Sequence, residues 1–333
     1  MKLAHNSILA LKLGAKILPS EIADYGVTTL GNVYWVDADN GADTDDGLTA
    51  QTAFKTIAKA YATVVSDHND VIILSATATP HAQTSMLTIA KNRVHFVGAD
   101  LRNGAYGMGA RARITMGVTT ATTDVAVLLN TGTGNTFSNI KFASDNTLTQ
   151  SLYTVVDSGE YAIYNNCEFY KSTMLDVSLA AEVLANGDST QWVDCVFGSD
   201  ANAVATACIR PNVLCTRGTA PSGTGQLRDN IFSHCLFLVL AGATATATRR
   251  VYGANANDVE RMLLFENCVF LASAASLATP GAAVGFGAAQ NVGTVLLKAC
   301  TSVAHTLMVA ASVGIYVDGA VPTFATTGVA KSS

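Results

Sequence analysis

A six-residue pattern recurs along the second half of the chain and constrains the fold more than any other feature. Its template is an aromatic residue, any residue, an Asn-like residue, Cys, any residue and Phe. Consecutive copies start 27, 28, 40, 33 and 32 residues apart, at Phe137, Tyr164, Trp192, Phe232, Phe265 and Leu297. Repetition at a period of about 20–50 residues is typical of a solenoid in which each repeat stacks on the last.

The template itself reads as a turn followed by a short strand. Its Cys and Phe stand two positions apart and point to one face of a strand, whereas the residue between them points to the other. The Asn or Asp before them tolerates left-handed backbone. The sequence therefore predicts an all-β fold, a single-stranded right-handed parallel β-helix. Two ordinary β-sandwich domains would explain the alternation but not the template.

Equivalent residues of stacked coils form ladders in such a solenoid. The predicted core ladder consists of Cys167, Cys195, Cys235, Cys268, Cys300, Phe142, Phe169, Phe197, Phe237 and Phe270, preceded by weaker copies at Val94–Phe96 and Ile114–Met116. Buried free cysteine behaves as a small hydrophobic residue. The cysteines lack CxxC spacing, so we expect core packing rather than a metal site or a disulfide chain.

The segment before the coils carries a family resemblance. Residues 33–36 predict a strand, residues 37–47 a loop rich in Asp, Asn and Gly, and residues 71–74 a buried strand. Between them we expect a helix that presents one face made of Phe54, Ile57, Ala58, Tyr61 and Val65. The order YWVD–NG–D–G, AFKTI–A and DVIIL resembles the opening segment of the pectin-lyase-like superfamily of right-handed parallel β-helices, including its phage virion members. The resemblance implies that the helix caps the open first coil, so the expected fold is a single-stranded right-handed parallel β-helix with an N-terminal capping helix.

We expect four regions along the chain. They are an N-terminal docking arm (1–30), a β-helix opening and capping segment (31–75), the coils (76–320) and a C-terminal tail (321–333). Lys12 and Lys16 interrupt the apolar residues of the arm, which argues against a secretory signal peptide. No membrane span is predicted. Seven cysteines, an odd number in a long chain, favour reduced thiols and intracellular synthesis.

The loop after the first strand holds the one candidate metal site. Carboxylates are hard oxygen ligands, so Asp37, Asp39, Asp43 and Asp45 could bind Ca²⁺. They do not fit the EF-hand spacing, and a turn rich in Asp, Asn and Gly needs no metal to explain it. We expect no other metal and no cofactor.

The positions between Cys and Phe are expected to point outward, so catalytic side chains of the coils would lie there. They read His95, Thr115, Lys141, Glu168, Val196, Leu236, Val269 and Thr301. Glycoside hydrolysis needs two carboxylates, and Glu168 stands alone in this column, although Asp157, Glu160, Asp176 and Glu182 remain candidates outside it. Both tryptophans are assigned inward, which leaves no exposed tryptophan for a sugar. Val196, Leu236 and Val269 predict an oligomer interface, because exposed apolar patches usually mark contacts.

These observations predict a protein without catalytic activity. The chain has 25 acidic and 20 basic residues and no basic cluster, which argues against nucleic-acid binding. By its resemblance we expect a structural protein of a bacteriophage virion, a capsid-decorating or spike-like homotrimer assembled in the host cytoplasm. Its partners would be itself and other virion proteins such as the major capsid protein. The alternative is a carbohydrate-active β-helix enzyme, such as a tail spike that depolymerises a host glycan. A cell-surface adhesin is a third possibility, weakened by the missing export signal.

Overall fold

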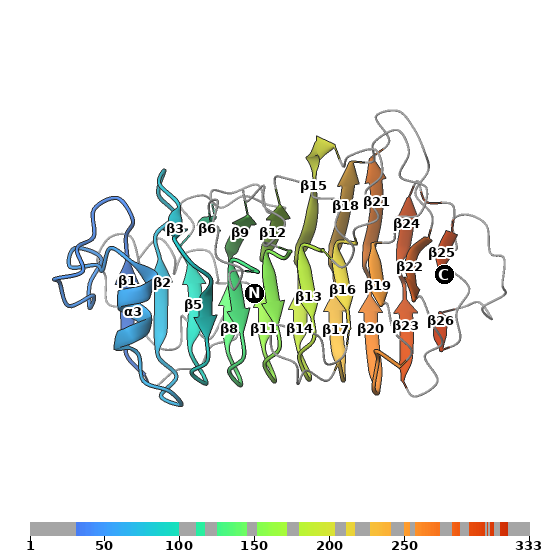
Figure 1. The fold of residues 1–333 in the computed structure, drawn as a ribbon, viewed down its shortest axis with the longest axis horizontal. Helices are drawn as coiled ribbons and strands as arrows, with labels where there is room; N and C mark the ends of the chain where they lie inside the picture. The colour runs from blue at the N-terminus through green and yellow to red at the C-terminus, as the bar shows by residue number, and fades with distance from the viewer. Residues whose placement is uncertain are drawn as a thin grey trace, which may run out of the picture.

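The computed structural model describes residues 31–99, 111–116, 125–144, 152–171, 180–203, 211–216, 227–240, 250–253, 257–273, 282–286, 293–303, 305, 307–309 and 314–318. In this part of the chain, three parallel sheets wind into an elongated solenoid, with the strands side by side along its length (Figure 1). The predicted all-β parallel β-helix is confirmed. The docking arm, the C-terminal tail and Asp176 lie outside the described residues.

Each coil passes through the three sheets in the same order, which we name A, B and C. Sheet A contains β1 (Val33–Val36), β2 (Val71–Leu74), β5 (His95–Gly98), β8 (Thr136–Ser138), β11 (Ile163–Asn165), β14 (Gln191–Val193), β17 (Asn230–Ser233), β20 (Met262–Glu266), β23 (Thr294–Lys298) and β26 (Ile315–Val317). Sheet B contains β3 (His81–Gln83), β6 (Ala112–Met116), β9 (Ile140–Ser144), β12 (Glu168–Lys171), β15 (Val196–Ala203), β18 (Leu236–Leu240), β21 (Val269–Ser273) and β24 (Thr301–Val303). Sheet C contains β4 (Leu87–Ile89), β7 (Leu128–Asn130), β10 (Val155–Asp157), β13 (Val183–Ala185), β16 (Val213–Cys215), β19 (Val251–Gly253), β22 (Ala282–Phe286) and β25 (Leu307–Val309).

The Asn-like position of the template is the corner between sheets A and B. One residue there adopts positive φ in every copy: Asn139, Asn166, Asp194, His234, Asn267 and Ala299. Asn and Asp tolerate this left-handed conformation better than most residues. The turn predicted from the sequence is therefore confirmed, and it lets the chain leave one sheet and enter the next within a single residue.

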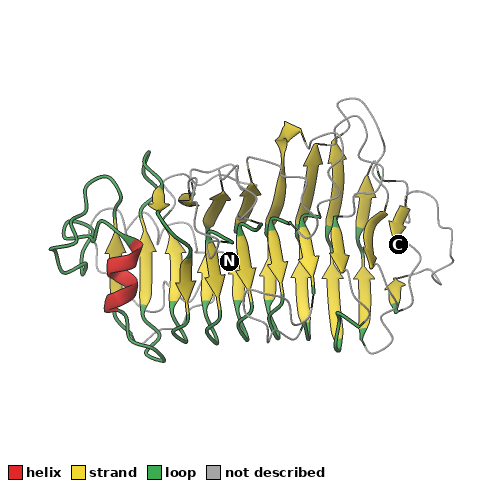
Figure 2. Ribbon diagram, viewed as in Figure 1, coloured by secondary structure: helices red, strands yellow, loops and turns green. Residues whose placement is uncertain are grey.

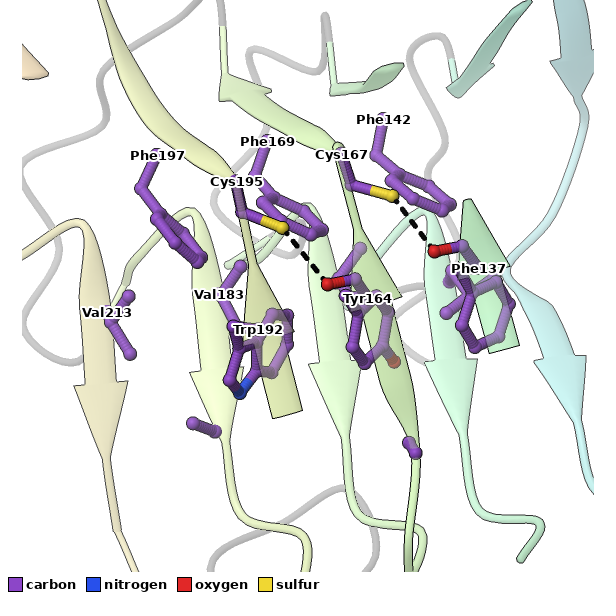
Figure 3. Packing of buried hydrophobic residues seen from close by; sticks show 14 of the residues in the cluster. Phe137, Phe142, Tyr164, Cys167, Phe169, Val183, Trp192, Cys195, Phe197 and Val213 are labelled. Atoms are coloured by element: carbon purple, nitrogen blue, oxygen red, sulfur yellow. Dashed lines mark hydrogen bonds between the residues drawn. The ribbon is translucent and has the colours of Figure 1, made fainter. Parts of the chain in front are cut away.

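Aromatic side chains stack in two columns inside the solenoid (Figure 3). In the column from sheet A, the Tyr164 ring centroid lies 4.8 Å from that of Phe137 and 4.1 Å from that of Trp192. In the column from sheet B, the Phe169 and Phe197 centroids are 5.0 Å apart. The two columns meet edge to face, an arrangement that aromatic rings favour.

The five ladder cysteines lie between these columns and are buried. Each thiol donates a hydrogen bond to the backbone carbonyl of the sheet A aromatic one coil earlier. Cys167 Sγ lies 3.3 Å from Phe137 O, and Cys195 Sγ lies 3.3 Å from Tyr164 O (Figure 3). The thiol thus fills a narrow space and also satisfies a carbonyl oxygen at the corner.

The predicted register is wrong in the early coils. Phe96 pairs with Phe137, so Val94–Phe96 belongs to sheet A rather than to sheet B. Ile114 pairs with Phe142, two residues away from its predicted partner, which puts Arg113 rather than Thr115 beside Lys141. The template assumes that strand B follows strand A after one corner residue, but residues 99–111 separate β5 from β6 in this coil.

The opening segment forms the predicted strand, helix and strand. Helix α3 (Ile57–Thr63) begins at Thr56, whose side chain accepts a hydrogen bond from Lys59 N, and the helix lies at one end of the solenoid (Figure 2). Ile57 and Ala60 are buried, as is Val64 directly after the helix. The predicted helix face is wrong at Ala58 and Val65, which are exposed, because Val64 turns inward where the helix ends.

Trp35 also differs from its inward assignment. It lies on the outer face of β1, half-buried against Val71 and Ile73 of β2, whereas the neighbouring Tyr34 and Val36 point into the core. Trp192 points inward, as assigned.

Candidate functional site

The outer face of sheet B changes character along the solenoid. Arg113, Lys141 and Glu168 pair in register across β6, β9 and β12. The next strand replaces this charged column with Val196, which pairs with Leu236 and through it with Val269. We call the charged half the charged patch and define it as Arg111, Arg113, Lys141, Glu168 and Tyr170.

Glu168 is the centre of the charged patch. Its Oε1 lies 2.5 Å from Lys141 Nζ, and its Oε2 lies 3.7 Å from an Arg111 guanidinium nitrogen. The Lys141 ammonium also lies 5.0 Å from the centroid of the Tyr170 ring, within the range of a cation–π contact. The outward column offers Glu168 no second carboxylate, but two cations, Lys141 and Arg111, flank it.

Corner asparagines hold Arg111 in place. The Arg111 side chain is only 4% exposed and donates a hydrogen bond to Asn166 Oδ1 over 2.7 Å. Asn166 in turn donates to Asn139 Oδ1 over 3.1 Å, so the corner column fixes the guanidinium. Arg113 donates to the Ala78 carbonyl. Fixed guanidinium groups of this kind suit carboxylate recognition.

The charged patch carries three cations and one carboxylate. Lys141 and Glu168 are 30% and 24% exposed, so solvent and solutes reach them. An excess of positive charge on a sheet whose neighbouring half is apolar favours an anionic ligand at this place. Arg111 and Arg113 were not predicted as site residues, because the predicted register of β6 against β9 was wrong.

The other carboxylates considered from the sequence are dispersed. Asp157 is buried inside the solenoid and accepts hydrogen bonds from side chains there. Glu182 is also buried, with Asn212 Nδ2 3.3 Å from its Oε2. Glu160 pairs with Asp188 at the turns between sheets C and A, away from sheet B. None of the three described candidates joins Glu168.

Two carboxylates of the candidate calcium loop, those of Asp37 and Asp43, accept hydrogen bonds from the chain itself. Asp37 Oδ1 accepts from Asp39 N and Asn40 N, and Asp43 accepts from Thr56 at the start of α3. Nowhere in the described ranges do three His, Cys, Asp or Glu side chains gather as metal ligands would.

The structure places the predicted interface residues on one outward column. Val196 and Leu236 are half-buried and Val269 is 36% exposed. Leu238 pairs with Leu271 beside this column, and Leu271 pairs with Val303.

A search of the described ranges for a helix with the length and apolar character of a membrane span found none.

Comparisons with known proteins identify the fold. No protein-family model and no curated protein matches the sequence. Among solved structures, a pectin methylesterase in complex with a hexasaccharide is 12% identical, with a TM-score of 0.60, over 90% of this chain and 92% of that one. Pectate lyase Pel9A is 13% identical (TM-score 0.54; 83% and 64% covered). A rhamnogalacturonan lyase is 12% identical (TM-score 0.53; 82% and 74% covered).

These neighbours support the resemblance and correct one expectation. The chain has the pectin-lyase-like right-handed parallel β-helix fold. The expectation that the protein is not an enzyme is contradicted, because all three neighbours are enzymes by name. They accord with the carbohydrate-active alternative better than with a non-catalytic structural role, although identities of 12–13% carry the fold alone.

Proposed function

We propose that the protein is a carbohydrate-active β-helix enzyme that acts on an acidic polysaccharide at the charged patch. The observation that carries this proposal is the Lys141–Glu168 pair, flanked by Arg111 and partly open to solvent. The named neighbours act on pectin, pectate and rhamnogalacturonan. Pectate is a polymer of a uronic acid, whose carboxylate is the kind of anion that Lys141 and Arg113 would bind.

A single carboxylate among cations favours elimination over hydrolysis. Glycoside hydrolysis uses two carboxylates, and the described part of the charged patch has only Glu168. In β-elimination, one base removes the proton next to the sugar carboxyl group, and nearby cations stabilise the charge that develops. The C4–O bond to the leaving sugar then breaks as a C4–C5 double bond forms, the departing oxygen takes a proton from water, and the base retains the proton that it removed.

The residues of the charged patch can be assigned to these roles. A sugar carboxylate that binds Lys141 and Arg113 would compete with Glu168 for the Lys141 ammonium. Glu168 would then lose its ion pair with Lys141 and act as the base. Arg111, which is buried and held by Asn166, would keep the Glu168 carboxylate in place. Tyr170 would offer its ring beside the bound sugar.

The biological setting is proposed from the resemblance and the apolar column. A tail spike of a bacteriophage, assembled as a homotrimer and exposed to a host glycan, combines such an enzyme with a subunit contact. Val196, Leu236 and Val269 are the residues that we assign to that contact, next to the charged patch on the same sheet.

The test is activity against uronic acid polymers. Purified protein is incubated with pectate, alginate and hyaluronate, and unsaturated products are followed by ultraviolet absorbance. We expect product from at least one polymer, and a loss of about 10²–10⁴-fold in kcat for Glu168→Gln, the range typical of removing a general base. Lys141→Ala should raise KM, because it removes a binding cation.

The matched control is Glu266→Gln. Glu266 pairs with Lys298 on the outer face of sheet A, with 2.7 Å between Oε1 and Nζ, so it repeats the chemistry of the Lys141–Glu168 pair elsewhere. It should retain full activity. The proposal fails if wild type releases no unsaturated product from any of these polymers, or if Glu168→Gln is as active as Glu266→Gln.

A further inference from the structure

The outer face of sheet A is deeply buried at the end of the solenoid that carries helix α3 (Figure 1). The outward residues Val71 and Ile73 of β2 are 0% and 2% exposed, and Val97 of β5 is 7% exposed. Their neighbours in the strands, such as Ile72, point to the opposite side and belong to the core. We call this surface the covered face and define it as Val71, Ile73, His95, Val97 and Ser138.

Contacts between neighbouring strands do not account for this burial. Ile231 and Leu264 occupy the column of Val71 farther along the same sheet, each with a strand on both sides, and both are only half-buried. Tyr316 continues the column on the last strand and is 49% exposed. An apolar sheet face becomes fully buried when another element packs on it. The covered face therefore requires a second layer of chain.

The described residues do not supply that layer. Among them, the apolar cluster of the covered face contains only side chains of β1, β2 and β5 and the adjoining Ala99, and none from helix α3. Two buried polar atoms of this face, His95 Nδ1 and Ser138 Oγ, have no hydrogen-bond partner within the described ranges. Because buried polar atoms are usually paired, the second layer must carry polar groups as well as apolar ones.

Two segments outside the described residues connect directly to this part of sheet A. Residues 100–110 follow β5 and lead to Arg111 at the start of sheet B, so both of their ends lie at the corner where the strands of sheet A end. Val71 lies at the opposite edge, where the strands begin. Residues 1–30 lead into that edge, because Val33 at the start of β1 pairs with Val71. The connection therefore favours residues 1–30.

The composition of residues 1–30 also suits an apolar surface. Leu9, Leu13 and Ile17 follow one another at the spacing of one face of a helix. At about 1.5 Å per residue, a helix from Leu9 to Ile17 covers about 12 Å, close to the roughly 10 Å that separate β2 from β8 at two strand spacings. Residues 100–110 are instead rich in glycine, which disfavours a helix.

We propose that residues 1–30, the N-terminal arm, pack on the covered face of the same chain. Leu9, Leu13 and Ile17 lie on the apolar side chains of β2 and β5, and polar groups of the arm pair with His95 and Ser138. The arm thus closes the first coils from the side, as helix α3 closes them from the end. The covered face contains no residue of sheet B, so the inference does not depend on the reaction proposed at the charged patch.

The first test is a photo-cross-link in the full-length protein. Trp35 is half-buried and pairs with Ile73 beside the covered face, so Trp35→p-benzoylphenylalanine places a photoreactive group there. We expect mass spectrometry to find it joined to peptides from residues 1–30. The product should keep the monomer mass in denaturing electrophoresis, because the arm belongs to the same chain. Tyr316→p-benzoylphenylalanine, at the other end of the same sheet, should give no cross-link to the arm.

The second test changes the arm and monitors Trp35 by fluorescence. Leu13→Asp places a charge in the centre of the apolar helix face, so we expect release of the arm, emission at longer wavelength and stronger quenching by acrylamide. Trp192 is buried in the core and should contribute equally in all variants. Ala15→Asp adds the same charge about 160° away around a helix and should behave like wild type.

Each other outcome overturns the inference. A cross-link from position 35 to residues 100–110 would assign the second layer to that segment, and a product of twice the monomer mass would assign it to a second copy of the chain. Failure to cross-link residues 1–30 would place the arm elsewhere. Equal emission and quenching in Leu13→Asp and Ala15→Asp would show that this face of the arm does not cover Trp35.

Discussion

Tyr164 donates its phenolic hydroxyl to Asp157 Oδ1 over 3.1 Å inside the solenoid, where neither side chain is exposed. Asn130 Nδ2 lies 2.8 Å from the same oxygen, and Thr190 Oγ1 lies 2.6 Å from Oδ2. Burial raises the pKa of Asp157 to about 6, although these hydrogen bonds oppose the change. A carboxyl group that prefers its proton is therefore built into the core.

This relationship predicts a pH-dependent stability. The pKa of Asp157 is higher in the folded chain than its ordinary value of 3.8, so the folded state binds the proton more tightly. The stabilisation from this group is complete below about pH 4 and is lost as pH rises through about 6. A shift of about two pKa units corresponds to about 3 kcal/mol. We expect urea denaturation to show wild type less stable at pH 8 than Asp157→Asn.

The comparison at lower pH serves as the internal control. An amide at position 157 can accept from Asn130 and Tyr164 and donate to the Thr190 hydroxyl, and Asn130 already occupies the paired position on β7. Wild type and Asp157→Asn should therefore have similar free energies of unfolding near pH 4. A difference between them that stays constant from pH 4 to pH 8 would contradict the assignment of the titration to Asp157.

The stacked aromatic column predicts a large cost for a cavity. The Phe197 ring is fully buried, with centroids 5.0 Å from Phe169 and 4.9 Å from Phe237. Phe197→Ala should lower the free energy of unfolding by about 3–5 kcal/mol, measured by denaturant titration. Leu48→Ala, at a 54% exposed position, should change it by less than about 0.5 kcal/mol. Equal effects of the two changes would show that the column does not stabilise the fold.

The cysteine ladder predicts thiols that are protected from reagents. Cys195 and Cys235 are 1% exposed, and burial raises the pKa of the Cys235 thiol. In a Cys208→Ser background, which removes the cysteine outside the described residues, both should label with iodoacetamide only as fast as the coils open. Mass spectrometry of the native protein measures this. Labelling of either residue at the rate of a free thiol would disprove its place in the core.

The sequence predicted the interior better than the surface, for a physical reason. Cys195 and Phe197 are two positions apart on one short strand, so local alternation decides that both point inward. The surroundings of Glu168 depend instead on register across coils. Arg111 reaches Glu168 from the residue before β6, two coils earlier, across insertions of variable length, and no local pattern encodes that contact.

Trp35 illustrates the same limit. Its outward orientation was not predicted, because Tyr34 and Val36 were equally good candidates for the core. An apolar side chain on a short strand can pack on either face, and Trp35 packs on the outer face against β2.

The apolar column of sheet B predicts the consequence of one added charge. Val196, Leu236 and Val269 pair in register on the outer face, and we propose that they contact neighbouring subunits of a homotrimer. Complete burial of a fully exposed side chain of this size contributes about 1.5–3 kcal/mol, and these half-buried side chains would each contribute part of that to an assembly. Leu236→Lys should therefore give soluble monomers by sedimentation velocity, with circular dichroism unchanged because Phe237 still fills the core.

A matched change on another sheet separates the contact from a general effect of charge. Leu264 is half-buried on the outer face of β20 in sheet A, next to Phe265 of the core. Leu264→Lys adds the same charge to the same kind of strand and should leave the trimer intact. If wild type sediments as a monomer, the column has no subunit to contact. If Leu236→Lys remains a trimer, the contact lies elsewhere, because a desolvated lysine in the centre of three apolar side chains would disrupt it.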